Sequence, residues 1–332
     1  MRTVHVAAFL FCGLLSGPAL FAQGLGEPQE PQFIKQGHEL EREGKLADAL
    51  SVYRKAFQLA PHSLDATMAA GSVLDLMGNG LEARRYLGRA IDSADTPEQR
   101  ASAERAMAIS YAFEGNCQQA GEYERRVFEY YGMAKNYYEQ GEIADEAGRV
   151  CIDAAPDVPR SVMNERSMAK AADLESSEKW YKLGHDTGLK EPGIKPDRVD
   201  LWNFRWEHAL ARLAARRGDR AAAQKHVAAA KAILDKGRIP QQEPFFPYLE
   251  GYVAFYGRDY KTALADFLKS NQKDPFIQCM LGRTYEELGD KTNAIEYYRK
   301  AASAVSHNPP AAYAVPFAKK RLLALHAASA GA

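Results

Sequence analysis

The stretch PFIQCMLGRTYEELGDKTNAIEYYRKAA, residues 275–302, decides the fold of this chain. It predicts two short amphipathic helices, because small and apolar residues recur at spacings of three and four on both sides of a tight turn at Gly289-Asp290. The face-marking residues are Leu281 and Tyr285 on the first helix, then Ala294, Tyr298 and Ala301 on the second. Gly282 and Ala294 are small where the two backbones would approach. We therefore expect a helical hairpin here.

The same pattern recurs elsewhere in the chain at a fixed spacing of 34 residues. The pairs of positions at this offset are Gly37 and Gly71, Gly44 and Gly78, Ala49 and Ala83, and Ala56 and Ala90. A fixed period of this size indicates stacked units that bury a continuous core only when neighbours pack together. The pattern predicts an all-α protein, a right-handed superhelix (α-solenoid) of about seven helix pairs with a C-terminal capping helix.

These residues resemble the tetratricopeptide repeat family. Its signature has a small residue and an apolar or aromatic residue on the first helix, a Gly turn, then Ala, an aromatic residue and Ala on the second helix, and a closing Pro. In the first unit these positions hold Gly37, Leu40, Gly44, Ala49, Tyr53, Ala56 and Pro61, and in the last unit Gly282, Tyr285, Gly289, Ala294, Tyr298 and Ala301. The resemblance implies a binding scaffold, although the family's partners are diverse.

The repeats give a domain plan for the whole chain. It comprises residues 1–22 as a signal peptide, 23–32 as a flexible lead-in, 33–128 as three N-terminal units, 129–196 as a degenerate unit with an insertion, 197–307 as three C-terminal units, and 308–332 as capping helix and tail. Gly282 follows Gly251 by only 31 residues, so we expect the first helix of the seventh unit to be shortened.

The capping helix is expected between residues 316 and 326. Its charged residues, Lys319, Lys320 and Arg321, should face water, and its leucines, Leu322, Leu323 and Leu325, should face inward. A polar outer face is what the end of an open array of repeats requires.

The N-terminus has the pattern of a secretory signal. Arg2 precedes an apolar run over residues 6–15, and small residues up to Ala22 offer a cleavage site. The run is short and broken by Gly17-Pro18, so we expect no stable membrane span after cleavage. We therefore expect an exported protein, either periplasmic or secreted.

The mature chain would keep Cys117, Cys151 and Cys279. An odd number of cysteines in an oxidising compartment leaves at least one thiol unpaired. Cys117 and Cys151 lie in consecutive units and could be bridged, but three small residues buried in helix packing are the favoured interpretation.

No pattern for catalysis is present in the sequence. HExxH, CxxC, Gly-x-Ser-x-Gly and a Gly-rich phosphate loop are all absent, and the eight histidines are scattered. We therefore expect no enzyme activity, no cofactor and no metal site. The formal net charge is zero, so composition gives no support for nucleic-acid binding.

The C-terminal units offer the best candidate for a binding surface. In such an array the first helix of each unit lines the concave groove, and a basic strip lies beside an aromatic strip there. The candidate partner-binding residues are Arg205, His208, Arg212, Arg216, Tyr248, Tyr252, Tyr256, Phe276 and Arg283. Arginine forks can hold carboxylates, and aromatic rings add apolar area and cation–π contacts.

The predicted function is thus an exported, non-catalytic protein-interaction scaffold that binds a peptide or a partner protein in its groove. Two alternatives stay open. The aromatic strip could stack on the sugar rings of an envelope polymer or glycan, or the convex face could make the chain a structural subunit of an envelope assembly.

Overall fold

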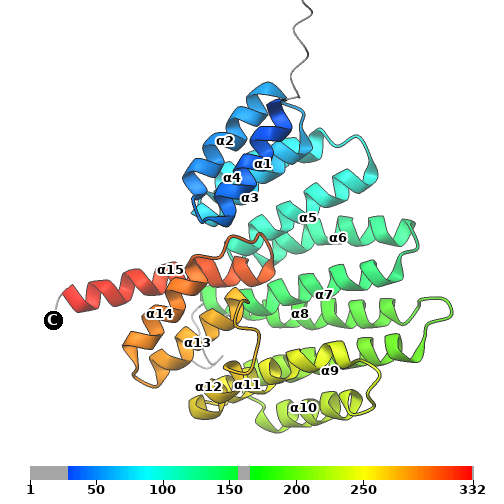
Figure 1. The fold of residues 1–332 in the computed structure, drawn as a ribbon. Helices are drawn as coiled ribbons and strands as arrows, with labels where there is room; N and C mark the ends of the chain where they lie inside the picture. Colours follow the sequence, from blue (N-terminus) through cyan, green and yellow to red (C-terminus); the bar gives the residue numbers. More distant parts are fainter. Residues whose placement is uncertain (1–28, 156–164, 331–332) are drawn as a thin grey trace, which may run out of the picture.

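A computed structural model describes the backbone of residues 29–155 and 165–330, with side chains described for residues 29–155 and 172–325. Within these ranges the fold is all-α, and successive helices pack as antiparallel pairs (Figure 1). The helices are α1 Gln29–Arg42, α2 Leu46–Leu59, α3 Leu64–Met77, α4 Gly80–Asp92, α5 Pro97–Phe113, α6 Cys117–Met133, α7 Tyr137–Ala154, α8 Glu165–Gly188, α9 Pro196–Arg216, α10 Arg220–Leu234, the 3-10 helix η2 Pro240–Phe245, α11 Phe246–Tyr256, α12 Tyr260–Phe267, α13 Pro275–Glu287, α14 Lys291–Ala302 and α15 Pro309–Ala330. The predicted array of helix pairs is confirmed.

In five of the hairpins, a glycine on the first helix faces a large side chain on the second; these glycines are Gly37, Gly71, Gly148, Gly251 and Gly282. A Cβ added at Gly251 would lie 2.8 Å from the ring of Phe267, and one added at Gly282 would lie 2.7 Å from the ring of Tyr298. Because only a hydrogen fits there, the aromatic ring packs directly on the helix backbone. This contact explains why the repeat carries a small residue at that position.

The turns within the hairpins require backbone angles that favour glycine. Gly78 and Gly289 have φ values of 89° and 82°, in the left-handed region that side chains disfavour. The sixth pair departs from this pattern, because Arg258 adopts a φ of 64° in its turn. Asp259 then caps α12 by accepting a hydrogen bond from the amide of Thr262.

The shortened helix lies in the sixth pair and not in the seventh. α13 keeps 13 residues, so the predicted shortening of that helix is wrong, whereas α12 has only 8. α12 ends early because Ser270 and Gln272 bond back to the last carbonyls of the helix, those of Asp266 and Phe267. Asp274 then starts α13 with Pro275 in its first position.

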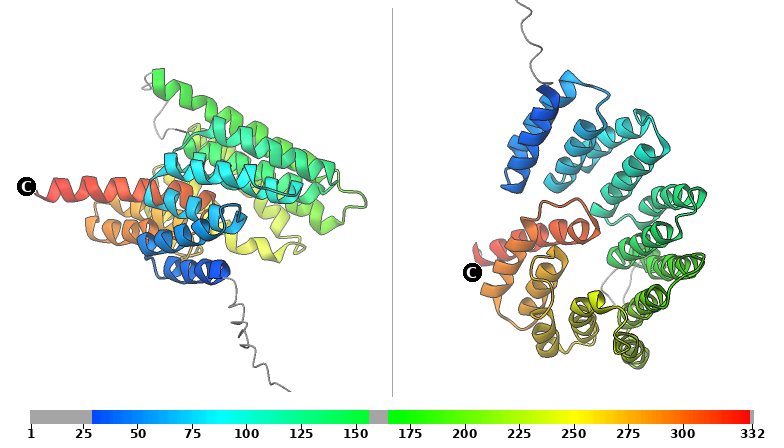
Figure 2. Two further views of the ribbon diagram at one scale, coloured as in Figure 1. Left: turned by 90° about the horizontal axis from the view of Figure 1, so that it is seen from above. Right: turned by 45° about the vertical axis from the view of Figure 1, so that its right-hand side comes forward.

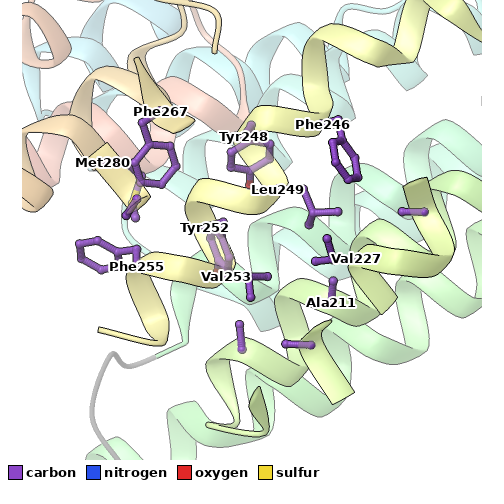
Figure 3. Packing of buried hydrophobic residues seen from close by; sticks show 14 of the residues in the cluster. Ala211, Val227, Phe246, Tyr248, Leu249, Tyr252, Val253, Phe255, Phe267 and Met280 are labelled. Atoms are coloured by element: carbon purple, nitrogen blue, oxygen red, sulfur yellow. The ribbon is translucent and has the colours of Figure 1, made fainter. Parts of the chain in front are cut away.

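The largest apolar core joins α9, α10, α11, α12 and α13 (Figure 3). Leu249 and Phe267 are fully buried in it, and Tyr252 is 1% exposed. In Figure 3, Val253 and Val227 lie in the same layer, where α11 meets α10. This core fixes the fifth, sixth and seventh pairs as one continuous body.

The C-terminal helix α15 packs on α13 and α14 and also reaches across to α5 and α7 (Figure 2). Ala311 and Val315 of α15 pack against Leu76 at the end of α3, and Ala312 packs against Ile109 of α5. The array therefore curves far enough for its last helix to meet the inner face of its early units. The predicted end of an open array is corrected to a closure, because the small residues of α15 let it approach these helices closely.

The orientation predicted for the capping helix is partly wrong. Lys319 is partly buried and donates a hydrogen bond of 2.7 Å to the carbonyl of Leu76, and Arg321 pairs with Glu286. Leu323 is 74% exposed, although it was expected to face inward. Lys319 is held by α3 on the other side of the array, and Arg321 is held by α13. A capping helix with one face free to water would have left both side chains exposed.

Cys117 and Cys151 form a disulfide, with a Cα–Cα distance of 4.7 Å. The preference for three unbridged cysteines is therefore wrong. The start of α6 lies beside the end of α7, and this brings the two thiols together and ties the third pair to the fourth. Cys279 is buried within α13 and stays outside the disulfide.

In the described parts of the chain, no helix is both long and apolar enough to cross a membrane. The expected signal peptide at residues 1–22 lies outside the described residues.

Candidate functional site

The inner face of the array holds a cavity of about 370 Å³ between α7, α9 and α11. Carboxylates from α7 line it, together with basic side chains from α9 and the first prolines of α15. The lining residues used below are Glu142, Asp145, Glu146, Arg149, Tyr181, Arg205, His208, Arg212, Phe245, Tyr248, Pro309 and Pro310. α15 therefore supplies part of the wall, so the closure of the array shapes the cavity.

Four of the nine predicted binding residues lie on this cavity, namely Arg205, His208, Arg212 and Tyr248. The spacing of three and four along α9 places its three basic residues on one face, as predicted. The other five predicted residues do not line this cavity; they are Arg216, Tyr252, Tyr256, Phe276 and Arg283.

Arg205 is neutralised by acids from the neighbouring unit. Its Nη1 lies 2.5 Å from Glu142 Oε1 and 3.8 Å from Asp145 Oδ2, and its guanidinium lies 5.0 Å from the centre of the Trp202 ring. Arg205, predicted as a partner-binding residue, is therefore already paired within the chain. Its fork is held by α7 and is not free to receive a ligand.

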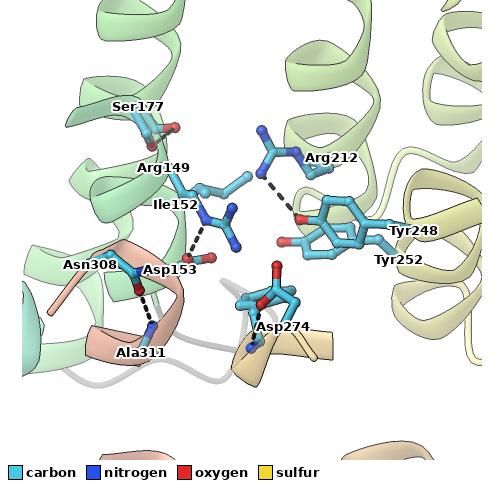
Figure 4. A network of polar contacts seen from close by, with 12 residues as sticks. Arg149, Ile152, Asp153, Ser177, Arg212, Tyr248, Tyr252, Asp274, Asn308 and Ala311 are labelled. Carbon is cyan, nitrogen blue, oxygen red and sulfur yellow. Dashed lines mark hydrogen bonds and ion pairs between the residues drawn. The ribbon is translucent and has the colours of Figure 1, made fainter. Parts of the chain in front are cut away.

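Arg212 has a different environment. It is 6% exposed, and it donates hydrogen bonds to the hydroxyl of Tyr248 at 3.3 Å (Figure 4) and to that of Tyr181 at 2.8 Å. Among the described residues, no carboxylate lies within ion-pair distance of it. A buried cation held only by neutral hydroxyls keeps much of its positive potential. It is therefore the strongest attractor for an anion in the cavity.

Three nitrogen atoms on the cavity residues have no hydrogen-bond partner in the described part of the chain. They are Arg149 Nε, His208 Nε2 and Arg212 Nε. Arg149 Nε comes within 3.6 Å of Asp153 Oδ2, which is beyond hydrogen-bond distance. An unsatisfied buried polar group costs about 1–3 kcal/mol, so an acceptor that reached these atoms would be bound favourably.

The titration of the cavity residues reflects this arrangement. Burial raises the pKa of Asp145 to about 7, although Arg205 opposes the shift. Burial also lowers the pKa of His208 well below its usual range, and the positive charges of Arg212, Arg149 and Arg205 add to that effect. His208 is therefore neutral at pH 7, and Asp145 is poised between its two forms.

The other predicted arginines, Arg216 and Arg283, contact backbone carbonyls and aromatic side chains within the chain. Arg216 donates to the carbonyls of Ile152 and Ala155, at 2.8 and 2.6 Å, and Arg283 donates to the hydroxyl of Tyr313 at 2.7 Å. Arg216 and Arg283 also lie over the ring of Tyr256, 4.9 and 5.9 Å from its centre. These two arginines link α9 and α13 to neighbouring elements.

The aromatic strip is largely closed. Tyr252 and Phe276 are 1% and 2% exposed, and their rings stack on each other with centres 6.5 Å apart. Tyr248 is 8% exposed and meets Phe276 edge to face. Because these ring faces are already covered, the arrangement disfavours stacking on a sugar.

Sequence reasoning missed the α7 side of the site. Glu142, Asp145, Glu146 and Arg149 were not among the predicted binding residues. Their spacing of three and four places them on one face of α7, and this periodicity was the available signal. Among the described residues, no group of three or more His, Cys, Asp or Glu side chains could hold a metal ion.

The family model described as Tetratricopeptide repeat matches residues 277–304, which cover most of α13 and all of α14. The seventh helix pair is thus similar to a tetratricopeptide repeat. This unit is also the stretch in which the sequence pattern is clearest. No curated protein matches the chain in sequence.

Several solved structures resemble the chain in fold. The apo form of RapI is 14% identical over 82% of this chain and 96% of its own, with a TM-score of 0.49. A tetratricopeptide repeat protein from Parabacteroides merdae is 13% identical over 88% and 100%, with a TM-score of 0.47. A Rap protein complexed with Competence and Sporulation Factor is 11% identical over 90% and 76%, with a TM-score of 0.44. At this similarity they identify no partner for this chain.

Proposed function

We propose that this chain is an exported, non-catalytic protein-interaction scaffold, which binds an extended peptide segment of a partner at the cavity between α7, α9 and α11. The observation that carries the proposal is that one nitrogen atom each of Arg149, His208 and Arg212, all on one cavity, has no hydrogen-bond partner among the described residues. A peptide offers carbonyl and carboxylate oxygens that would satisfy them.

The size and position of the cavity favour a peptide over a folded domain. A volume of about 370 Å³ holds a few side chains only. Phe245 is 50% exposed and lines the cavity together with the charged side chains of α7 and α9, so it offers apolar area at the cavity edge. A segment that laid one apolar and one anionic side chain here would use both features.

Contacts across the array make the cavity a preformed site. α15 closes it on one side through Pro309 and Pro310, and Arg205 ties α9 to α7 through Glu142. Little rearrangement is therefore needed on binding, which saves the entropy of ordering the site. The exposed large apolar residues lie singly on different elements, as Leu81 and Met133 do, which disfavours a structural role for the convex face.

Export is the second half of the proposal. The N-terminal pattern of charge, apolar run and small residues supports it, and so does the Cys117–Cys151 disulfide, because such bonds persist in oxidising compartments. A fusion of residues 1–40 to a reporter that is active only outside the cytoplasm tests it. An inactive reporter, with the fusion protein present in the cell, would contradict export.

The binding site is tested with a library of random heptapeptides passed over the purified chain. We expect the parent to enrich a peptide family, and Arg212→Gln to lose it because the uncompensated cation is gone. The control is Arg217→Gln, since Arg217 is 41% exposed and pairs with Glu178 on another surface. Enrichment of the same peptides by Arg212→Gln would show that the cavity is not the site.

A second variant covers the case in which Arg212→Gln fails to fold. Phe245→Ala removes a half-exposed ring at the cavity edge and leaves the core intact. We expect it to weaken binding of the enriched peptides about tenfold, in line with the loss of apolar contact area. Unchanged affinity, or no enrichment of any peptide by the parent, would overturn the proposal.

A further inference from the structure

We infer that the cavity takes up a carboxylate-type monoanion together with a proton, and that Asp145 carries this proton. The inference rests on the proposed function, since it names the chemistry and the regulation of the same site. It is carried by the positions of the unpaired nitrogens and of the carboxylates on facing helices.

The attraction for an anion comes from α7 and α9 together. Arg149 Nε, Arg212 Nε and His208 Nε2 have no hydrogen-bond partner among the described residues, although Arg149 Nε forms an ion pair with Asp153 Oδ2 at 3.6 Å. Arg212 is at least nine-tenths buried, so its charge is poorly screened. An oxygen anion among these atoms would accept charge-assisted hydrogen bonds, which are roughly twice as strong as neutral ones.

The repulsion comes from carboxylates that line the same cavity. Asp145 lies 3.8 Å from Arg205 Nη1, but that arginine is shared with Glu142 at 2.5 Å. The charged and titratable groups around Asp145 are Glu142, Glu146 and Arg149 of α7, Arg205, His208 and Arg212 of α9, Tyr181 of α8 and Tyr248 of α11. Glu146 is engaged by Arg105 at 2.5 Å, so its charge is largely balanced.

Asp145 is thus the carboxylate that takes up a proton when the anion binds. Its pKa of about 7 means that a second negative charge nearby would drive protonation at neutral pH. His208 also faces the anion, but its pKa lies well below the usual range, so a larger shift would be needed to charge it. Neutral His208 can still donate one hydrogen bond.

The same carboxylates select the charge of the ligand. A dianion, such as a sulfate or phosphate ester group, would meet Glu142 and Asp145 with twice the repulsion of a monoanion. A carboxylate side chain of a peptide suits this balance, in which Arg212 attracts the anion, Arg149 is shared with Asp153, and Asp145 is the acid that titrates.

The test uses acetate and sulfate as probes, since neither changes charge between about pH 6 and about pH 8. Thermal unfolding of the full chain is followed at increasing probe concentration, and the shift in Tm gives an apparent affinity. We expect acetate to bind about fivefold more weakly at the higher pH, because deprotonated Asp145 competes with it. Sulfate should stabilise the chain less than acetate at both values.

Asp145→Asn keeps the shape of the side chain and removes the carboxyl group that titrates. We expect acetate to bind this variant with the same affinity at both pH values. The matched control is Asp186→Asn, because Asp186 pairs with Lys182 on α8, is 45% exposed and should leave the pH dependence intact. A calorimetric titration in two buffers of different ionisation enthalpy should show proton uptake by the parent and none by Asp145→Asn.

Each result separates this inference from the proposed function. Stabilisation by acetate that is equal at both pH values, or a pH dependence that survives in Asp145→Asn, would overturn the proton linkage while peptide binding stands. Sulfate binding more tightly than acetate, or no effect of acetate at either pH, would overturn the choice of ligand. Loss of peptide enrichment by the parent, in contrast, would remove the proposed function itself.

Discussion

His307 Nε2 lies 2.9 Å from Asp75 Oδ2, although the two residues are 232 positions apart in the chain. Asp75 is 2% exposed and also accepts a hydrogen bond from Ser110 Oγ at 2.9 Å, and the imidazole of His307 stacks on the ring of Phe113. This contact joins the segment before α15 to α3 and α5. It is the polar part of the closure whose apolar part is formed by Leu76 and Val315.

Replacement of His307 by Ala should loosen this closure. Asp75 would stay buried with one hydrogen-bond partner fewer, so we expect the free energy of unfolding to fall by about 1–3 kcal/mol. Urea unfolding measures the loss, with His62→Ala as the control because His62 is exposed. A His307→Ala chain as stable as the control would show that the contact contributes nothing to the closure.

Glu124 should make the fold sensitive to alkaline pH. It is fully buried, and burial together with the negative charge of Glu146 raises its pKa well above the usual range, while Arg105 opposes the shift. The native state therefore holds a proton that the unfolded chain has released, so stability falls as pH rises from the unfolded pKa through the folded one.

Glu124→Gln removes that proton and should stabilise the chain by more than about 1 kcal/mol near pH 8, with a gain that shrinks toward about pH 4. Urea unfolding at several pH values measures it. Glu122→Gln on the exposed face of the same helix is the control and should show no such trend. A gain that did not vary with pH would mean that Glu124 does not titrate in this range.

The Cys117–Cys151 disulfide should stabilise the chain by restricting its unfolded state. The loop it closes spans 34 positions, so reduction should cost about 4 kcal/mol. Unfolding with and without reductant measures the cost. The variant with Cys117→Ser and Cys151→Ser should be insensitive to reductant, whereas Cys279→Ala should keep the sensitivity. Equal stability of the parent in both conditions would contradict the bridge.

The glycine contacts within the hairpins predict opposite effects for two Gly→Ala changes. In Gly251→Ala the new methyl group would lie 2.8 Å from the ring of Phe267, so we expect a loss of about 1–3 kcal/mol. At Gly88 the same methyl group meets nothing within 4 Å, so Gly88→Ala should raise helix stability by up to about 1 kcal/mol. Thermal unfolding compares the two, and the same sign for both would refute the packing argument.

The repeat pattern predicted most helices well, because it depends on local rules. Small residues at the crossing points, glycine in the turns and Asp or Asn at helix starts each act within one hairpin. The shortened helix was predicted in the seventh pair but lies in the sixth, since its early end depends on capping contacts of Ser270 and Gln272 that no spacing rule encodes.

Half of the candidate site was open to prediction. The basic face of α9 follows from helical periodicity, so Arg205, His208 and Arg212 were found. Their partners on α7 were missed, because a charged residue on a helix looks the same in sequence whether it meets water or an arginine from another unit. The aromatic residues Tyr252 and Phe276 belong to the core, which only their measured exposure reveals.

The sequence by itself determined the all-α class, the repeat and the register of each hairpin, because these depend on contacts between residues fewer than about two turns of helix or one hairpin apart. Only the tertiary structure decided that α15 returns to α3 and α5, that Cys117 bonds Cys151, and that Arg212 is a buried cation whose hydrogen bonds go to tyrosine hydroxyls. The disulfide and the Arg212 contacts depend on how neighbouring units pack, whereas the return of α15 depends on the accumulated curvature of the array. Small angles between neighbours add up over the array, and no local pattern in the sequence records their sum.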